Sequence, residues 1–229
     1  MALNNFEADI VNKELLLLQQ LDVEKRFKKI VSDKYGLGLF AKEFYFLRCN
    51  FYKLNFIVGA KCPPHEKYWS GLTENLVEEL GGEFKITHNQ LYRDFLWEAA
   101  ELKEEDLVTP PHYTITFNGS WEGYCIERDF EEGLLAIGLY EALDVPDYEL
   151  MERALRATTN LSEKGLRFFT VHAKAQHYSM FENIIDEIQD REGKTDLVAQ
   201  ATNFVIKTQR FMWTNLLQNL EQRLASDRH

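Results

Sequence analysis

The feature of this sequence that most constrains its fold is a helical spacing of apolar residues that continues through nearly the whole chain. The clearest stripe has members alternately four and three residues apart: Phe40, Phe44, Leu47, Phe51, Leu54 and Val58. Such spacing places all members on one face of an α-helix. Tyr45, Tyr52 and Phe56 widen that face, so we expect this helix to be buried on two sides. The pattern predicts an all-α protein.

Extending the same reading to the rest of the chain gives the expected helices and their ends. We expect helices over residues 5–33 with a break near Leu21, 37–60, 66–80, 86–102, 118–144, 147–160, 162–190 and 195–226. Proline interrupts helices, and Asp and Ser favour their first positions. Pro146 is therefore expected to end a helix, with Asp147 and Ser162 as N-caps, while Gly193 marks a C-terminal stop.

One segment looks different, and no linker divides the chain. Residues 113–117, Tyr-Thr-Ile-Thr-Phe, follow two prolines and resemble a strand, so we expect an extended loop ending at Asn118-Gly119. No Gly/Ser/Pro-rich stretch occurs in mid-chain, so residues 1–229 are expected to form a single helical bundle domain.

The charge of the chain argues against polyanionic partners. The formal net charge is −11, and the densest basic segment, residues 24–29, is short. Binding to phosphate backbones or anionic lipid surfaces needs a concentrated positive field. We therefore expect no nucleic-acid or membrane partner, and interpret residues 24–29 as the solvated face of a helix.

Cysteine usage and the N-terminal segment point to the cytoplasm. Three cysteines, Cys49, Cys62 and Cys125, form no Cys-x-x-Cys pair and no even-numbered disulfide framework. Met1 to Asp9 lacks the features of a signal peptide, and the run Leu15–Leu18 is far shorter than the ~20 apolar residues that span a bilayer. The sequence therefore predicts a soluble cytoplasmic protein.

Two histidines lie on apolar helical stripes. His88 shares a row with Leu91, Phe95 and Ala99, and His172 shares one with Phe169. Both imidazoles are therefore expected to face inward. An inward histidine is often only a hydrogen-bonded core residue, and that alternative stands for each of them taken alone.

Two carboxylates can join these histidines. Glu141 continues the stripe of Leu134 and Ile137, which would bury its charge unless it is paired or bound to metal. Glu79 precedes Gly81-Gly82, and a break there allows Glu79 and His88 to face the same interior, although Glu79 could also be a solvated helix-end charge. Mixed imidazole and carboxylate ligation suits iron or manganese in an oxygen-activating role.

The arrangement differs from that of ferritin-like proteins. Those bundles carry Glu-x-x-His pairs on two helices. Here the residues three positions before the helical histidines are Lys85, Phe169 and Lys174. A different helical scaffold for iron is therefore expected.

Three ordered segments resemble the haem-oxygenase-like di-iron oxidases and oxygenases. They are residues 75–81 (Asn-Leu-Val-Glu-Glu-Leu-Gly) followed by His88, then Leu139-Tyr140-Glu141, then Phe168-Phe169-Thr170-Val171-His172. The resemblance covers about half of the chain, from residue 75 to about residue 182. It implies a haem-oxygenase-like helical bundle, Fe(II) as cofactor with two ions per chain, and O2 as co-substrate.

The resemblance also implies a set of metal ligands. Glu79, His88, Glu141 and His172 match the family's pattern. The family's final His-x-x-x-Asp-x-x-His does not continue, because Gln176 and Ser179 occupy its last two ligand positions.

Two other residues are candidates for the missing ligands. His177 is the nearest substitute, but a step of five residues turns it about 140° from His172 on a regular helix. We therefore predict a π-bulge or unwinding between Ala173 and Met180, and a second iron held more loosely than the first. Glu182 is a weaker candidate for the missing carboxylate.

The implied function is O2-dependent oxidation of a small substrate, an amino acid or amine. The most specific expectation is the family's nitrile-forming branch, which oxidises the amine of a tryptophan-type amino acid. Tyr45, Phe51, Tyr52 and Phe56 are expected to form an apolar substrate wall, with ordinary core packing as the alternative. A homodimer is left open.

Other functions of the fold remain as alternatives. Haem is not expected, because the first histidine is His65 and lies beyond the first helix. A thiaminase-like enzyme could use Cys125 near Trp121 and Tyr124. A non-enzymatic helical interaction protein is the third candidate, and an exposed apolar stripe would be its mark.

Overall fold

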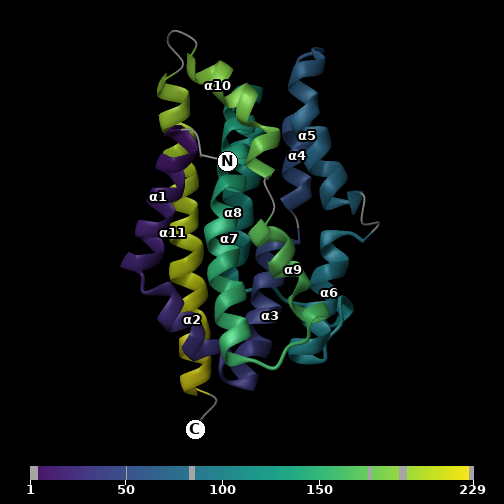
Figure 1. Ribbon diagram of the computed structural model, residues 1–229, viewed down its shortest axis with the longest axis vertical. Helices are drawn as coiled ribbons and strands as arrows, with labels where there is room; N and C mark the ends of the chain where they lie inside the picture. The colour runs from purple at the N-terminus through teal and green to yellow at the C-terminus, as the bar shows by residue number, and fades with distance from the viewer. Residues whose placement is uncertain (1–4, 50, 83–85, 175–176, 191–194, 227–229) are drawn as a thin grey trace.

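The computed structural model describes residues 5–49, 51–82, 86–174, 177–190 and 195–226 (Figure 1). This part of the chain contains helices and no strand, which confirms the all-α prediction. The elements are α1 Asn5–Gln20, α2 Val23–Val31, α3 Lys34–Arg48, α4 Phe51–Gly59, α5 Glu66–Glu79, α6 His88–Ala100, α7 His112–Glu127, α8 Phe130–Thr158, α9 Glu163–Lys174, α10 Glu182–Asp190 and α11 Thr195–Ser226, with 3-10 turns η2 Glu104–Asp106 and η3 His177–Met180.

Helix α8 is the centre of the bundle. It is buried over most of its length and packs against α1, α2, α9 and α11 (Figure 1). It continues through Pro146, so the predicted helix end at Pro146 and the N-cap at Asp147 are wrong. A proline inside a helix costs ~3 kcal/mol. We attribute the continuity of α8 to its packing, since neighbours cover it on several sides.

Helix α7 replaces the predicted extended loop. It begins directly after Pro111, and it buries Tyr113, Phe117, Trp121 and Cys125, which are four residues apart. That spacing is helical, but the β-branched and aromatic residues of 113–117 favour strands locally. Burial of the four-residue row outweighs this local preference, and proline suits a helix start.

Two other predicted helices are each divided. The break near Leu21 is confirmed, with Asp22 in a left-handed conformation at φ 51° between α1 and α2. Residues 37–60 form α3 and α4 instead of one helix. The stripe from Phe40 to Val58 is buried, but Tyr52 and Phe56 are exposed, so the expectation that they widen its buried face is wrong.

The C-terminal third also departs from a single helix over 162–190. Helix α9 ends at Lys174, and η3 and α10 follow, so the helix is interrupted in the predicted region between Ala173 and Met180. The Ser162 hydroxyl accepts a hydrogen bond from Gly165 N at 3.2 Å, which confirms Ser162 as an N-terminal cap. Gly193 lies outside the described residues, and α11 matches its predicted range.

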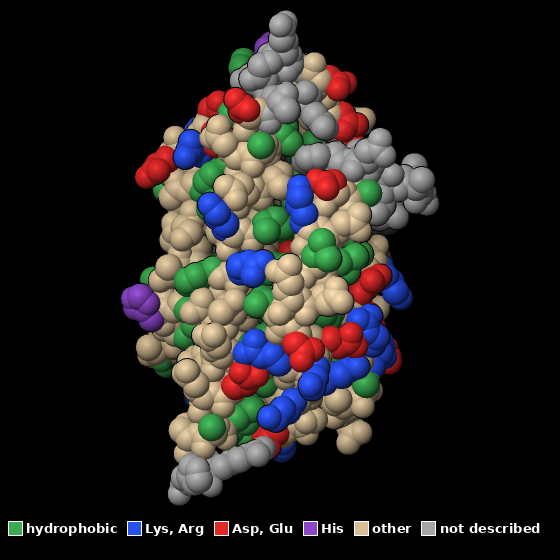
Figure 2. All heavy atoms as spheres, turned by 90° about the vertical axis from the view of Figure 1, so that its left-hand side faces the viewer, with side chains coloured by type: hydrophobic (Ala, Val, Ile, Leu, Met, Phe, Trp, Pro, Cys, Tyr) green, Lys and Arg blue, Asp and Glu red, His purple; other side chains and the backbone are tan. Residues whose placement is uncertain are grey.

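Charge on the face of α1, α2 and α11 is mixed. Figure 2 shows basic side chains interleaved with acidic ones across the lower part of this face. Arg26 pairs with Glu221 at 2.7 Å, and Lys28 pairs with Glu24 at 2.8 Å. Among the described residues, no helix is both long and apolar enough to cross a membrane.

Candidate metal centre

A glycine turn between α5 and α6 brings the first two candidate ligands together. Glu79 is the last residue of α5, and His88 is the first of α6. Gly81 has φ +110°, and a Cβ there would meet Ile86 N at 2.9 Å, so only glycine fits this turn. The Thr87 hydroxyl caps α6 by accepting a hydrogen bond from Gln90 N. As a result, Glu79 Oε1 and His88 Nδ1 are 2.9 Å apart.

His172 reaches the same place from α9. Its Nδ1 lies 2.7 Å from the carbonyl oxygen of Phe168, an acceptor that requires the imidazole proton on Nδ1. Nε2 is therefore the nitrogen that can coordinate a metal, the usual arrangement of a metal-binding histidine. The imidazole also stacks on the Tyr148 ring, with centroids 4.5 Å apart and planes at 25°. These contacts fix the orientation of the ring.

Together, Glu79, His88 and His172 form a compact donor set. One ligand atom from each lies within 4.8 Å of the others, and the His88 and His172 rings are 4.5 Å apart. Both histidines are buried, and Glu79 is mostly buried. Two imidazoles with one carboxylate are the donor set that holds non-haem Fe(II) in many oxygenases, so the residues present fit iron.

A cavity of about 20 Å³ adjoins this donor set. Tyr45 and Phe51 from the predicted substrate wall line it, whereas Tyr52 and Phe56 are outside its lining. The rest of the lining comprises Arg48, Cys49, Glu79, His88, Asn89, Tyr92, Phe168 and His172. Burial raises the pKa of the Cys49 thiol to about 11, so it stays protonated at neutral pH.

The structure does not bring every predicted ligand into the same group. Glu141 is buried on α8 and accepts a hydrogen bond from Asn75 Nδ2 at 2.9 Å. Glu182 begins α10. Burial raises the pKa of Glu7 and of Asp186, and the negative charge of Glu182 raises both further. Neither Glu141 nor Glu182 belongs to the three-residue group found among the described residues. The side chain of His177, like Gln176, lies outside what the structure describes, so its role as a ligand stays a prediction.

Sequence reasoning missed a buried cation beside the centre. The Arg48 guanidinium donates to Asp144 Oδ2 at 2.7 Å and to the Tyr140 hydroxyl. It also lies over the rings of Phe51, Tyr140 and Tyr148, 5.1–5.3 Å from their centroids. One signal was available: Arg48 follows Leu47 inside the most apolar helix stripe, where a charge needs a partner.

Arg48 contacts what we call the α8 carboxylate row, Glu141, Asp144 and Asp147, which are three residues apart. Burial raises the pKa of Asp144 to about 7, although the charge of Arg48 lowers it. Burial also raises the pKa of Asp147 to about 6, although hydrogen bonds, including those from Trp213 and Gln209, lower it. Glu14 of α1 has a pKa well above its usual value because of burial and the nearby Asp147. These carboxyl groups therefore bind protons at a higher pH than exposed carboxyl groups do.

Comparison with known proteins agrees with this fold and chemistry. A family described as iron-containing redox enzymes has a model that matches residues 39–207, more than half of the chain. No curated protein sequence matches the chain.

Similar solved structures cover nearly the whole molecule. A CADD-like protein of unknown function from Nostoc punctiforme PCC 73102 is 16% identical with a TM-score of 0.74, over 95% of this chain and 96% of that one. A domain of unknown function with a heme oxygenase-like fold from Shewanella denitrificans OS217 is 16% identical with a TM-score of 0.75, over 98% and 94%. A TenA homologue from P. horikoshii OT3 is 14% identical with a TM-score of 0.60, over 93% and 98%. At these identities the likeness shows the fold alone, which is haem-oxygenase-like.

Proposed function

Because the chain belongs to the family of iron-containing redox enzymes, we propose that it is a non-haem, O2-dependent oxidase or oxygenase whose iron is held by Glu79, His88 and His172. The observation that carries this proposal is the convergence of the three donor atoms within 4.8 Å in the bundle interior. The elements that supply them are α5, α6 and α9, which are separate in sequence.

Iron bound there would supply the electron transfer that lets O2 react, and the protein positions the reactants and excludes water. The Phe168 carbonyl holds the His172 proton on Nδ1, so that Nε2 is the nitrogen that would bind iron. The Tyr148 ring stacks on the His172 imidazole and prevents its rotation. Glu79 keeps the His88 imidazole oriented through their 2.9 Å hydrogen bond.

The number of irons is part of the proposal. A second iron next to the first would draw on Glu141 and on His177, with Glu182 as a further candidate. Gln176 and Ser179 are poor replacements for an aspartate and a histidine, so the second ion would be held more loosely.

The proposed substrate is a small amine or amino acid. Tyr45 and Phe51 would contact its apolar part, since both line the cavity. Small-molecule pockets usually measure about 300–1,000 Å³, far more than the cavity of about 20 Å³. Binding of any amino acid, including a tryptophan-type one, therefore requires the walls to separate.

Anaerobic Fe(II) titration followed by exposure to O2 tests the proposal. The parent should bind iron at one tight site and then consume O2. Glu79→Ala, His88→Ala and His172→Ala should each lose tight binding, whereas His65→Ala, at the exposed start of α5, should behave as the parent. Equal iron binding by the parent and all three site variants would rule out this centre.

A thiaminase-like activity is the second candidate, favoured by the likeness of fold to the TenA homologue. It would use a cysteine nucleophile. Burial raises the pKa of the Cys125 thiol to about 12, so little thiolate would form at neutral pH. This candidate also leaves the buried Glu79, His88 and His172 without a role.

A further inference from the structure

Among the residues that the structure describes, the Tyr148 hydroxyl and the Trp121 indole N–H are buried without a hydrogen-bond partner, on side chains that are 1% and 2% exposed. Comparable groups are bonded: Tyr92 donates to the Ala41 carbonyl and Trp213 to Asp147. An unsatisfied buried polar group is costly, and phenylalanine would fill either position without that cost. The choice of Tyr and Trp therefore needs a reason other than packing.

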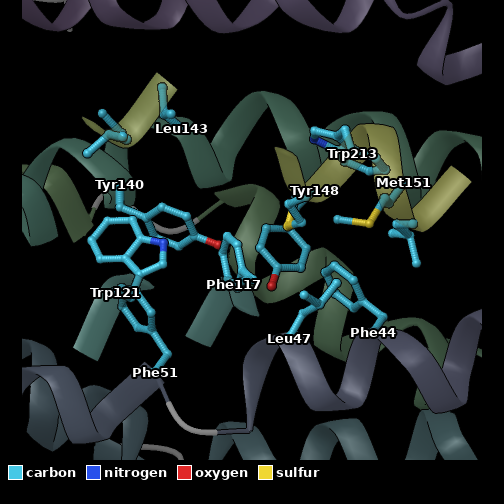
Figure 3. Packing of buried hydrophobic residues seen from close by; sticks show 14 of the residues in the cluster. Phe44, Leu47, Phe51, Phe117, Trp121, Tyr140, Leu143, Tyr148, Met151 and Trp213 are labelled. Carbon is cyan, nitrogen blue, oxygen red and sulfur yellow. The ribbon is translucent and has the colours of Figure 1, made fainter. Parts of the chain in front are cut away.

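Both side chains belong to one row of aromatic rings that starts at the metal centre. Tyr148 stacks on His172 with centroids 4.5 Å apart. Arg48 lies over both the Tyr148 and Tyr140 rings and donates to the Tyr140 hydroxyl. Tyr140 then contacts Trp121 edge to face at 5.0 Å. In Figure 3 the Tyr140 ring lies between the Trp121 indole and the Tyr148 ring.

The row continues from Trp121 to the surface. The Trp121 ring is 4.9 Å from Phe204, which stacks on Tyr124 at 3.8 Å with the planes 10° apart. Tyr124 is half-buried, and its hydroxyl donates to Glu132 Oε1 at 3.0 Å. Arg128, which lies over the Tyr124 ring, is exposed. Thus side chains of α8 and α7, with Arg48 of α3 and Phe204 of α11, form a continuous series of contacts from the centre to solvent.

We propose that Tyr148, Tyr140, Trp121 and Tyr124 form an electron route between the surface and the metal centre. This inference rests on the proposed function, which supplies an oxidant at the centre. Tyrosine and tryptophan give up one electron far more readily than phenylalanine does, which explains why they occupy these positions. Tyr140 and Trp121 are in direct contact, Arg48 lies over the rings of both Tyr148 and Tyr140, and Phe204 contacts both Trp121 and Tyr124, so that each transfer spans at most one intervening side chain.

Each transfer moves one electron inward. The oxidised centre gains an electron and Trp121 loses it, by way of Tyr148 and Tyr140. Trp121 is reduced again by Tyr124, whose phenol proton passes to the Glu132 carboxylate. A one-electron reductant in solution, of the ascorbate or thiolate class, then restores Tyr124 as the proton returns from Glu132. The reductant is oxidised, the centre is reduced, and the protein is unchanged.

The test removes an electron from the surface end of the route with a photo-oxidant. A ruthenium polypyridyl photo-oxidant is attached to a cysteine introduced as Glu127→Cys, one helical turn from Tyr124, in a Cys49→Ser, Cys62→Ser background. In metal-free protein, a flash should give the transient absorption of a tryptophan radical. Trp121→Phe should abolish that signal, and the control Trp213→Phe, a buried tryptophan outside the row, should retain it.

A second arm measures delivery to the centre. In anaerobic Fe(II)-loaded protein, the flash should convert Fe(II) to Fe(III), followed by electron paramagnetic resonance. Trp121→Phe should slow this conversion roughly tenfold or more, the change that a barrier higher by about 1.4 kcal/mol produces. Trp121→Tyr should restore most of the rate, which a packing role alone would not explain.

The outcomes separate the two proposals. Equal rates in Trp121→Phe, Trp213→Phe and the parent would overturn the electron route, provided that circular dichroism shows all three folded. If no iron binds, the proposed function is wrong. The metal-free measurement still decides whether electrons pass between Trp121 and Tyr124.

Discussion

The candidate metal centre and the α8 carboxylate row are both buried polar regions of one apolar bundle, yet they satisfy their charges differently. At the centre, hydrogen bonds to Nδ1 orient both imidazoles. In the row, Arg48 pairs with Asp144, and the neutral Gln209 side chain donates a hydrogen bond to Asp147. Burial also raises the pKa of both carboxyl groups, which favours their protonated forms. Burial of charge therefore does not by itself mark a metal site. The centre is distinguished by two imidazoles and a carboxylate that converge beside a cavity.

The largest effect is expected from removing the cation of the carboxylate row. Arg48→Met leaves Asp144 buried without its partner, which should lower the free energy of unfolding by about 3–5 kcal/mol at neutral pH. Denaturation in urea measures it. Arg153→Met, in an exposed pair with Glu24, is the control and should change stability by less than about 1 kcal/mol. Similar losses in both variants would show that the buried Arg48–Asp144 pair contributes no more to stability than an exposed ion pair does.

The centre should respond to metal instead. Fe(II) added anaerobically at about 100 times its dissociation constant should stabilise the parent by about 2.7 kcal/mol, because it binds only the folded state. His172→Gln should lose this gain while its metal-free stability stays close to that of the parent. Thermal unfolding with and without Fe(II) measures both quantities. A full gain in His172→Gln would mean that the metal binds elsewhere.

The row should also control how stability depends on pH. Asp147 has a folded-state pKa of about 6, above its usual 3.8, so the folded protein binds more protons than the unfolded chain between these values. Its contribution is therefore complete below about pH 4 and is lost as pH rises through 6. Between about pH 5 and pH 7 the loss should be about 1.4 kcal/mol, one pKa unit's worth. Asp147→Asn should flatten this slope in denaturation series at both pH values, and an unchanged slope would contradict the assignment.

The smallest effect concerns the helix start that carries His88. Thr87→Ala removes the cap of α6 and should lower the free energy of unfolding by about 1 kcal/mol. It should also weaken iron binding, since His88 is the next residue. Thr87→Ser, which keeps the hydroxyl, is the matched control. If iron binding is as tight in Thr87→Ala as in Thr87→Ser, the cap does not orient the ligand.

The convergence of Glu79, His88 and His172 was easier to predict from the sequence than the contacts around it. The inward stripes of His88 and His172 and the Gly81-Gly82 break are local patterns, and they were enough to bring Glu79, His88 and His172 together. The carboxylate row could not be assigned in the same way. Whether Asp144 contacts Arg48 depends on how α3 packs against α8, because the two residues are 96 positions apart in the chain.

The fold shows the same division between local and tertiary causes. The break between α1 and α2 follows from local signals and was predicted. The passage of α8 through Pro146 and the helical state of residues 113–117 were not, because both oppose local preference. In both cases the buried faces of the helices decide the outcome, and these are created only when the bundle assembles.

The length and position of α11 bear on when the protein can fold during its synthesis. This helix runs along most of the bundle and packs against α1, α2, α3, α7 and α8 (Figure 1). Ribosomes add about 5–20 residues per second, so Glu79, His88 and His172 are all made seconds before α11 is complete. Until then the emerging chain carries its donor groups on an open, partly covered core. We therefore expect iron to be captured only once this helix has closed the bundle.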